Sequence, residues 1–195
     1  MSGPRLTLRY PAAGDAERLF ELASDPLVTR WFSWGPYTEV AQAEAWIAAQ
    51  AGKRAAGEIM DFVVEDRELG VLGVTGLTEV SRRDRRATVG SWMGRPSWGS
   101  GANTEAKALV AGLAFRRLGM ERLTAWANTR NGRSQRALER VGFRREGVLR
   151  AWHRHGDEMH DVVVFGMTRA VWASGPLSGV PVRIEGTPPE AFLVA

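Results

Sequence analysis

The chain has 195 residues, 44% of them hydrophobic and 25% charged, which suits one compact domain with a substantial core. It contains no cysteine, which excludes disulfide scaffolds, thiolate zinc sites and cysteine nucleophiles and makes a reducing, cytoplasmic setting the natural expectation. No apolar run approaches the roughly 18 residues that span a bilayer, and the first residues lack the pattern of a signal peptide, so we expect no membrane partner.

Arginine dominates the basic residues. The formal net charge is +4, and Lys53 and Lys107 are the only lysines among 26 basic residues. Codon usage is one explanation of this bias. The other is an anionic ligand, because guanidinium groups bind phosphates through two hydrogen bonds. The arginines are scattered and no aromatic-basic signature accompanies them, so we expect no nucleic-acid partner.

The first third of the chain predicts a strand and two helices. The alternating stretch over 5–9 predicts a strand, and apolar residues at helical spacing predict a helix over 15–24. Thr38 is placed to cap a second helix to about residue 51. Because Ala41 stands three residues after Thr38, we expect no capping box there.

Strands predominate in the rest of the chain. Alternating or apolar runs bounded by turn residues predict six more strands, and two more helices follow from helical spacing. The strands are expected over 60–65, 71–80, 87–93, 122–128, 143–152 and 159–167, and the helices over 103–118 and 132–141. About four helices must therefore cover one sheet of about seven strands, which predicts an α/β (α+β) fold with a mixed sheet.

The composition changes at residue 173. Gly, Ser and Pro recur through 173–195 and interrupt regular structure, so we expect a domain over 1–172 followed by a Gly/Pro-rich C-terminal tail. A mobile tail is the first expectation. The alternative is a short edge strand over 182–184 in an oligomer such as a homodimer.

A glycine-rich turn joins the strand over 87–93 to the helix that follows it, with Gly99 and Gly101 at its centre. Glycines leave backbone N–H groups unobstructed at a helix N-terminus, whose partial positive charge suits an anion such as a pyrophosphate. Taken alone, a plain loop is the commoner explanation. The turn is neither a Walker loop, since no Gly-Lys-Ser/Thr follows, nor a dinucleotide fingerprint, since Thr104 occupies the third glycine position.

Two motifs behind this turn give it a context. They are Asn-x-x-Ser over 131–134 and Gly-Phe-x-x-Glu-Gly over 142–147. The succession resembles the GNAT superfamily of acyl-CoA-dependent N-acyltransferases, and within it the RimJ/RimL branch, which includes acetyltransferases of ribosomal-protein N-termini. The resemblance extends over nearly the whole chain except the tail.

The resemblance implies a GNAT-type, mostly antiparallel sheet in which the fourth and fifth strands splay apart. The pantetheine arm of acetyl-CoA, the implied cosubstrate, lies against the fourth strand in that family. The residues implied to bind acetyl-CoA are Trp92, Met93, Arg95, Trp98, Gly99, Ser100, Gly101, Ala102, Asn103, Thr104, Asn131, Ser134 and Arg136.

Three residues are implied to act in the reaction. A backbone N–H near Met93 is expected to stabilise the oxyanion. Many GNAT enzymes have a Tyr acid where this chain has Leu138, and Ser134 is expected to take its place near the departing sulfur. His153 stands where some relatives have a carboxylate, and its titration range suits a base, with a water chain as the alternative.

Other positions depart from the family pattern or allow more than one role. Pro96 stands where the family has Arg or Gln, with Arg95 as the substitute, and Thr88 stands where many relatives carry Glu. Glu105 is expected to stabilise the helix dipole rather than to act in catalysis. His153-x-His155 could share a strand face, but without carboxylates at ligand spacing we expect no metal.

Four aromatic residues crowd one connection, and they either line a substrate cleft or cover the core. They are Trp31, Phe32, Trp34 and Tyr37. In GNAT folds this connection borders the acceptor site, so these four are the expected substrate-binding residues.

The sequence therefore predicts a cytoplasmic, acetyl-CoA-dependent N-acetyltransferase. The amine acceptor is expected to be a protein N-terminus or a small molecule, and the amine is expected to attack the thioester directly. A catalytically inactive CoA-binding sensor or interaction module is the alternative, because Thr88 and Leu138 occupy the usual base and acid positions. A ribosome- or RNA-associated protein that exploits the arginines is a second alternative.

Overall fold

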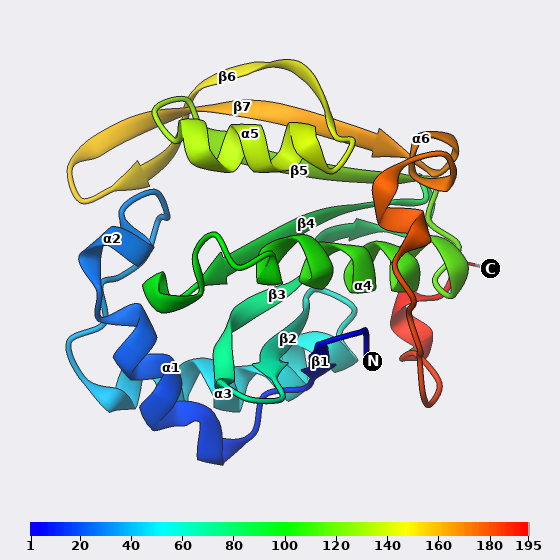
Figure 1. Cartoon of the computed structure of the whole chain (residues 1–195). Helices are drawn as coiled ribbons and strands as arrows, with labels where there is room; N and C mark the ends of the chain where they lie inside the picture. Colours follow the sequence, from blue (N-terminus) through cyan, green and yellow to red (C-terminus); the bar gives the residue numbers. More distant parts are fainter. Residues whose placement is uncertain (195) are drawn as a thin grey trace.

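Seven strands form one sheet in the computed structural model, which describes residues 1–194. The strands are β1 (Leu6–Arg9), β2 (Met60–Asp66), β3 (Gly70–Ser81), β4 (Arg86–Met93), β5 (Arg122–Asn128), β6 (Arg144–His155) and β7 (Glu158–Thr168). Their order across the sheet is β1-β2-β3-β4-β5-β7-β6, which leaves β6 at the edge (Figure 1). Each predicted strand is present, with ends that differ by at most a few residues.

The sheet changes direction between β4 and β5. The other neighbouring strands are antiparallel, whereas β4 and β5 are parallel and pair only from Arg86 to Thr88, opposite Arg122 to Thr124. Beyond Thr88 the two strands diverge (Figure 1). The predicted mixed sheet with splayed fourth and fifth strands is therefore confirmed.

Helices cover both faces of the sheet. Four of them match the predicted helices, and they are α1 (Ala16–Ala23), α3 (Val40–Ala55), α4 (Ala102–Arg116) and α5 (Gly132–Arg140). Two short helices were not predicted, and they are α2 (Pro26–Thr29) and α6 (Arg169–Ala173). Among residues 1–194, no helix combines the length and the apolar character needed to traverse a bilayer.

The two layers of helices enclose two apolar clusters. On one face α1 and α3 pack on β2 and β3, where Leu19, Ala43 and Val63 are buried together. On the other face α4 and α5 enclose the main core, which includes Leu109 and Phe165. Figure 1 shows α4 and α5 on the near side of the strands.

The start of α3 differs from the prediction. The helix begins at Val40, and Gln42 Oε1 accepts hydrogen bonds from the backbone N–H groups of Thr38 (2.7 Å) and Glu39 (3.2 Å). This is one half of a capping box, which we did not expect. The cap is Glu39 rather than Thr38, so the third residue after it is a glutamine and not Ala41.

The segment after α6 packs on the domain. Leu177 and Phe192 are buried in the main core, and Ser2 and Arg183 exchange two backbone hydrogen bonds of 2.9 Å. We expected this segment to be mobile, or to pair over 182–184 in an oligomer; it instead pairs with the N-terminus of the same chain. The physical reason is that α4 is apolar on nearly all sides, so its outer face also needs a cover.

Candidate active site

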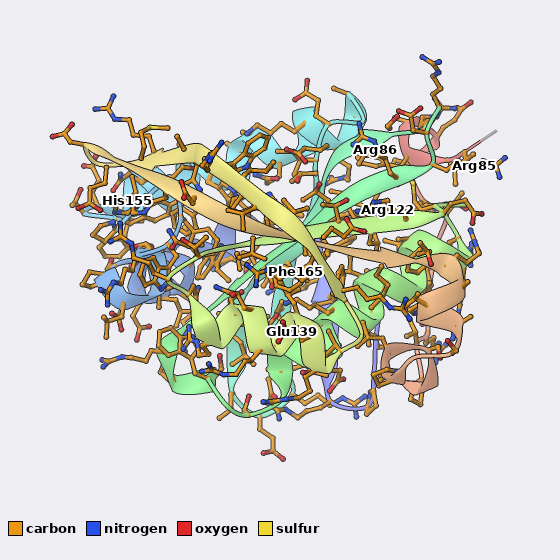
Figure 2. The ribbon with its side chains drawn as sticks, turned by 90° about the horizontal axis from the view of Figure 1, so that it is seen from above. Arg85, Arg86, Arg122, Glu139, His155 and Phe165 are labelled. Carbon is orange, nitrogen blue, oxygen red and sulfur yellow. The ribbon has the colours of Figure 1, made fainter. Side chains whose placement is uncertain are left out.

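The gap between β4 and β5 opens toward one end of the sheet. Arg86 and Arg122 are paired at the closed end. Figure 2 shows both at the opposite end of the sheet from His155, which lies near the tip of the β6–β7 hairpin. Toward that tip β4 pairs with β3 but, in the part of the chain that the structure describes, not with β5.

A backbone donor faces this gap. The N–H of Gly94, the residue after β4, donates a hydrogen bond to Leu72 O of β3 at 2.8 Å. Successive amides of an extended chain point in opposite directions, so the preceding N–H, of Met93, points away from β3 and into the gap. The expected oxyanion donor is therefore on the open edge.

A groove of about 400 Å³ runs from this edge past the glycine turn to α5. It brings together most of the predicted acetyl-CoA-binding residues. Those that line it are Trp92, Met93, Trp98, Gly99, Gly101, Asn103, Thr104, Asn131, Ser134 and Arg136.

The glycine turn is open toward the groove. Gly99 and Gly101 have positive φ angles of 80° and 85°, which glycine adopts without strain, and Gly101 is the N-cap of α4. A Cβ atom at either position would meet no other atom within 4 Å. Backbone amides at the positive end of a helix, beside unobstructed space, fit a diphosphate group.

Helix α5 adds positive charge to the opposite wall. Arg133, Arg136 and Arg140 all line the groove, although only Arg136 was predicted. The Arg133 guanidinium lies 3.3 Å from the centroid of the Trp98 ring, and Trp98 Nε1 donates to Met93 O at 2.7 Å. Arg136 and Arg140 follow Arg133 by three and seven residues, which puts all three on one face of the helix. This spacing could have predicted from sequence that they line the same wall.

Three predicted acetyl-CoA residues do not line the groove. Arg95 Nε forms an ion pair with Asp25, the N-cap of α2, at 2.8 Å. Ser100 Oγ donates to Ser97 O at 2.7 Å, and Ala102 is buried in the core. In the structure these residues hold the turn in place.

Ser134 stands at the start of α5. Asn131 Oδ1 accepts a hydrogen bond from the Ser134 N–H at 3.1 Å and so caps the helix, which explains the Asn-x-x-Ser spacing. The Ser134 side chain lines the groove, and its hydroxyl makes no hydrogen bond within residues 1–194. Leu138, at the usual tyrosine position, is buried in the core.

A second cavity, of about 360 Å³, adjoins the groove. The residues that line it are Leu19, Phe32, Trp34, Tyr37, Ala43, Trp46, Asp61, Val74, Gly90, Ser91 and Trp92. Phe32, Ser91 and Trp92 line both spaces, so the cavity and the groove meet at β4.

Aromatic rings form much of the cavity wall. Trp34 is the centre, with ring-centroid distances of 5.3 Å to Phe32, 5.5 Å to Tyr37 and 5.6 Å to Trp92. Three of the four predicted substrate-binding aromatics thus line this cavity. The fourth, Trp31, lines the groove instead.

Asp61 is the acidic residue in this cavity, and sequence reasoning missed it. It lies on β2 opposite Gly76 of β3, on the same strand face as Val63. Burial raises the pKa of Asp61 to about 7, while the positive charge of Lys53 acts in the opposite direction. The sequence signal for Asp61 was a carboxylate at a position of a strand where an apolar residue is expected.

A buried lysine lies beside the junction of the two spaces. Lys107 Nζ of α4 donates hydrogen bonds to Ser91 Oγ (2.8 Å) and to Asn103 Oδ1 (2.6 Å). Burial lowers the pKa of Lys107 to about 7. Both partners are neutral oxygens, which accept a hydrogen bond from the charged ammonium and from the neutral amine of Lys107 alike.

His153 lies outside both spaces. Its ring packs against Trp126 (5.5 Å between centroids) and His160 (5.4 Å), and both ring nitrogens are buried without a hydrogen-bond partner. Burial lowers the pKa of His153, and the neighbouring His160 and His155 add to this effect. Within residues 1–194, no three acidic or histidine side chains are grouped to hold a metal ion.

Two further sequence positions have structural partners. Glu105 Oε1 accepts hydrogen bonds from the N–H groups of Arg5 and Leu6, both at 2.8 Å, and so fastens β1 to α4. Thr88 Oγ1, where many relatives have a glutamate, donates to Glu79 Oε2 at 2.6 Å.

Comparisons with known proteins agree with this geometry. Residues 5–144 match the family model described as "Acetyltransferase (GNAT) domain". The chain is 30% identical over 170 residues to "Uncharacterized N-acetyltransferase p20" of Bacillus licheniformis, covering 87% of this chain and 96% of that protein.

Solved structures share the fold. A GCN5-related N-acetyltransferase from Brucella melitensis superposes with a TM-score of 0.78 at 26% identity, over 89% of this chain and 80% of that one. Spermidine N-acetyltransferase from Vibrio cholerae, solved with CoA and spermine, gives a TM-score of 0.75 at 20% identity, over 87% and 98%. The family match, the splayed sheet and the groove together show that the chain belongs to the GNAT family of acetyl-CoA-dependent N-acetyltransferases.

Proposed function

We propose that the protein transfers an acetyl group from acetyl-CoA to a primary amine by direct attack. The observation that carries this proposal is the Met93 N–H on the unpaired edge of β4, next to the open glycine turn of α4. The edge offers backbone groups to the pantetheine arm. The turn and the arginines of α5 offer donors and charge to the phosphates.

The chain's own residues supply two hydrogen-bond donors for the transfer. When bound, acetyl-CoA supplies the activated acetyl group. The Met93 N–H donates to the oxyanion as the amine attacks. The Ser134 hydroxyl, which is free of other hydrogen bonds within residues 1–194, donates to the departing sulfur. No acyl-cysteine can form, because the chain has no cysteine.

The acceptor amine enters through the second cavity, which meets the groove at Ser91 and Trp92. The amine must lose its proton to water before it attacks, because His153 lies outside both spaces. An α-amino group titrates near about 8 and a lysine near about 10.4, so the α-amino group of a protein N-terminus is the easier acceptor. A small-molecule amine enters by the same route.

An inactive CoA-binding sensor is the second candidate. The observation that favours it is the buried Leu138 at the usual tyrosine position, together with the Thr88–Glu79 hydrogen bond at the usual glutamate position.

Thiol release separates the two. Purified protein is incubated with acetyl-CoA and a panel of amines, and free CoA is measured with DTNB. The chain has no thiol of its own, so every signal comes from CoA. Turnover with an amine supports the enzyme; CoA binding by calorimetry with no turnover on any amine supports the sensor.

A further inference from the structure

The second cavity contains a carboxylate with no counter-charge bound to it. Within residues 1–194, Asp61 makes no ion pair and its carboxylate accepts no hydrogen bond, although it lies among apolar and aromatic side chains. Asp61 is partly buried, and withdrawing such a group from water without a partner is costly. Sites that keep an unpaired acid in this setting commonly use it on a ligand.

The floor of the cavity leads from this acid to β4 without side chains. Asp61 pairs with Gly76, and Gly76 pairs with Gly90, so the three residues form one row across β2, β3 and β4. Paired residues of antiparallel strands share a face of the sheet. The Asp61 carboxylate lies over Gly76, and Gly90, where a Cβ atom would meet no other atom within 4 Å, leaves the sheet surface open from there to the edge where the groove begins.

The walls of the cavity suit a cation. Aromatic faces attract ammonium groups, most strongly where water is excluded. Phe32, Trp34 and Tyr37 form one wall and Trp46 of α3 another, while Asp61 supplies the negative charge. A carboxylate among aromatic rings is the chemistry that recognises an alkylammonium.

Asp61 is too far from the reacting atoms to take a proton from the attacking amine. Its carboxylate lies over Gly76 of β3, one strand from β4, which is about 5 Å across the sheet. Along the strands it is offset by three residues from the row of Gly73 and Met93, about another 10 Å. Direct proton transfer needs about 3 Å. An ammonium group bound by Asp61 is therefore not the nitrogen that becomes acetylated.

We infer that the second cavity selects acceptors that carry a second cationic group, which Asp61 and the aromatic wall bind while the free amine reaches the groove over Gly90. This inference rests on the proposed function and names its substrate class: compact alkyl diamines and related amines with a distal ammonium. Lys53 and Tyr37 are the other titratable groups near Asp61.

Matched amines test the inference. We compare 1,5-diaminopentane and 1,6-diaminohexane with 1-aminopentane and 1-aminohexane, in wild type, Asp61→Asn and Glu68→Gln. Glu68 is an exposed acid in the β2–β3 turn outside both spaces, so its variant controls for the loss of one charge. Thermal unfolding confirms that each variant is folded.

In wild type and Glu68→Gln, KM for a diamine should be at least tenfold below that for its monoamine. In Asp61→Asn the two values should converge, because KM for the diamine rises to that for the monoamine. Equal KM values in wild type, or a preference that survives Asp61→Asn, would overturn the inference. An equal loss of kcat on both amines would overturn it too, because Asp61 would then act in the chemistry.

A binding measurement keeps this test separate from the proposed function. Calorimetry gives Kd for the diamine in the presence of CoA, without any turnover. If no amine releases thiol, the proposed function fails, but tenfold weaker diamine binding in Asp61→Asn still supports the cation site. Equal Kd values in wild type and Asp61→Asn would refute the cation site even in an active enzyme.

Discussion

Asp61 and Gly76 face each other across β2 and β3, and the Asp61 carboxylate occupies the space where a side chain at position 76 would lie. A Cβ atom built on Gly76 comes closer than 3.0 Å to Asp61 Oδ1 and to Met60 O. The glycine is thus the reason that an acid fits against the sheet at this point.

Gly76→Ala should therefore destabilise the protein and displace the carboxylate. Overpacking of this kind costs about 1–3 kcal/mol, because both backbone and side chain must shift. Gly90→Ala is the matched control, since a Cβ atom there meets no atom within 4 Å on the neighbouring strand. Urea unfolding measures both, and equal stability of the two variants would contradict the fit between Asp61 and Gly76.

Gly101→Val should abolish measurable binding of CoA, or weaken it at least tenfold. A valine at a φ of 85° is strained, and its methyl groups enter the space over the α4 amides. Gly70→Val separates strain from obstruction, because Gly70 also has a positive φ (69°) and open space but is the first residue of β3, outside the groove. Calorimetry should show wild-type affinity for Gly70→Val; a similar loss in both variants would point to strain alone.

Ser134→Ala should lower kcat while it leaves the Kd for CoA within about twofold. A positioned proton donor contributes roughly a factor of 100 or more, and the helix cap survives because Asn131 Oδ1 binds the Ser134 backbone N–H. Thiol release gives kcat and calorimetry gives Kd. Unchanged turnover would remove Ser134 from the reaction.

The groove was predictable because its parts are local in sequence. The strand β4, the glycine turn and the start of α4 are continuous over 86–116, and each follows from a short pattern of residues, whereas the open edge of β4 was implied by the family resemblance. The cap of α5 follows in the same way from Asn131 and Ser134. Turn and cap chemistry act within a few residues, so sequence shows them directly.

The second cavity was only half predictable. Its aromatic wall stands in one connection, but Asp61 and Gly90 come from strands that neighbour each other only through β3. Asp61 faces a cavity because Gly76 leaves room beside it and because the register of three strands aligns Asp61, Gly76 and Gly90. Gly76 is far in sequence from both of its strand partners. Neither is visible in a single local pattern.

His153 shows the limit of a period-2 pattern. The β6–β7 register shifts between Leu149 and His153, where Ala151 has a φ of 47° and its N–H donates to Asp161 Oδ1 at 2.8 Å. Such a bulge changes which face the following side chains occupy. The His153 ring consequently packs on Trp126. The alternation of residues along the strand could not predict which face of the sheet His153 occupies.

His153→Gln should leave an ionisation near neutrality in the pH–rate profile. The imidazole lies outside both the groove and the cavity, and its pKa is already lowered by burial and by the nearby His160 and His155. Measuring kcat/KM for one amine from acid to alkaline pH tests this. Loss of the ionisation would establish His153 as the general base expected from the sequence.

Asp61→Asn should change how stability depends on pH. The pKa of Asp61 is about 7 in the folded protein against an ordinary 3.8, so the folded state binds this proton more tightly than the unfolded chain. The contribution of Asp61 to wild-type stability must then fall as pH rises from about 4 to about 7, and the asparagine variant lacks this contribution. The variant should match wild type near pH 4 and exceed it by an amount on the order of a few kcal/mol at pH 8. Urea unfolding of both proteins across this range, with Glu68→Gln as the control, provides the measurement. A difference that does not vary with pH would mean that the acid is not desolvated in the cavity.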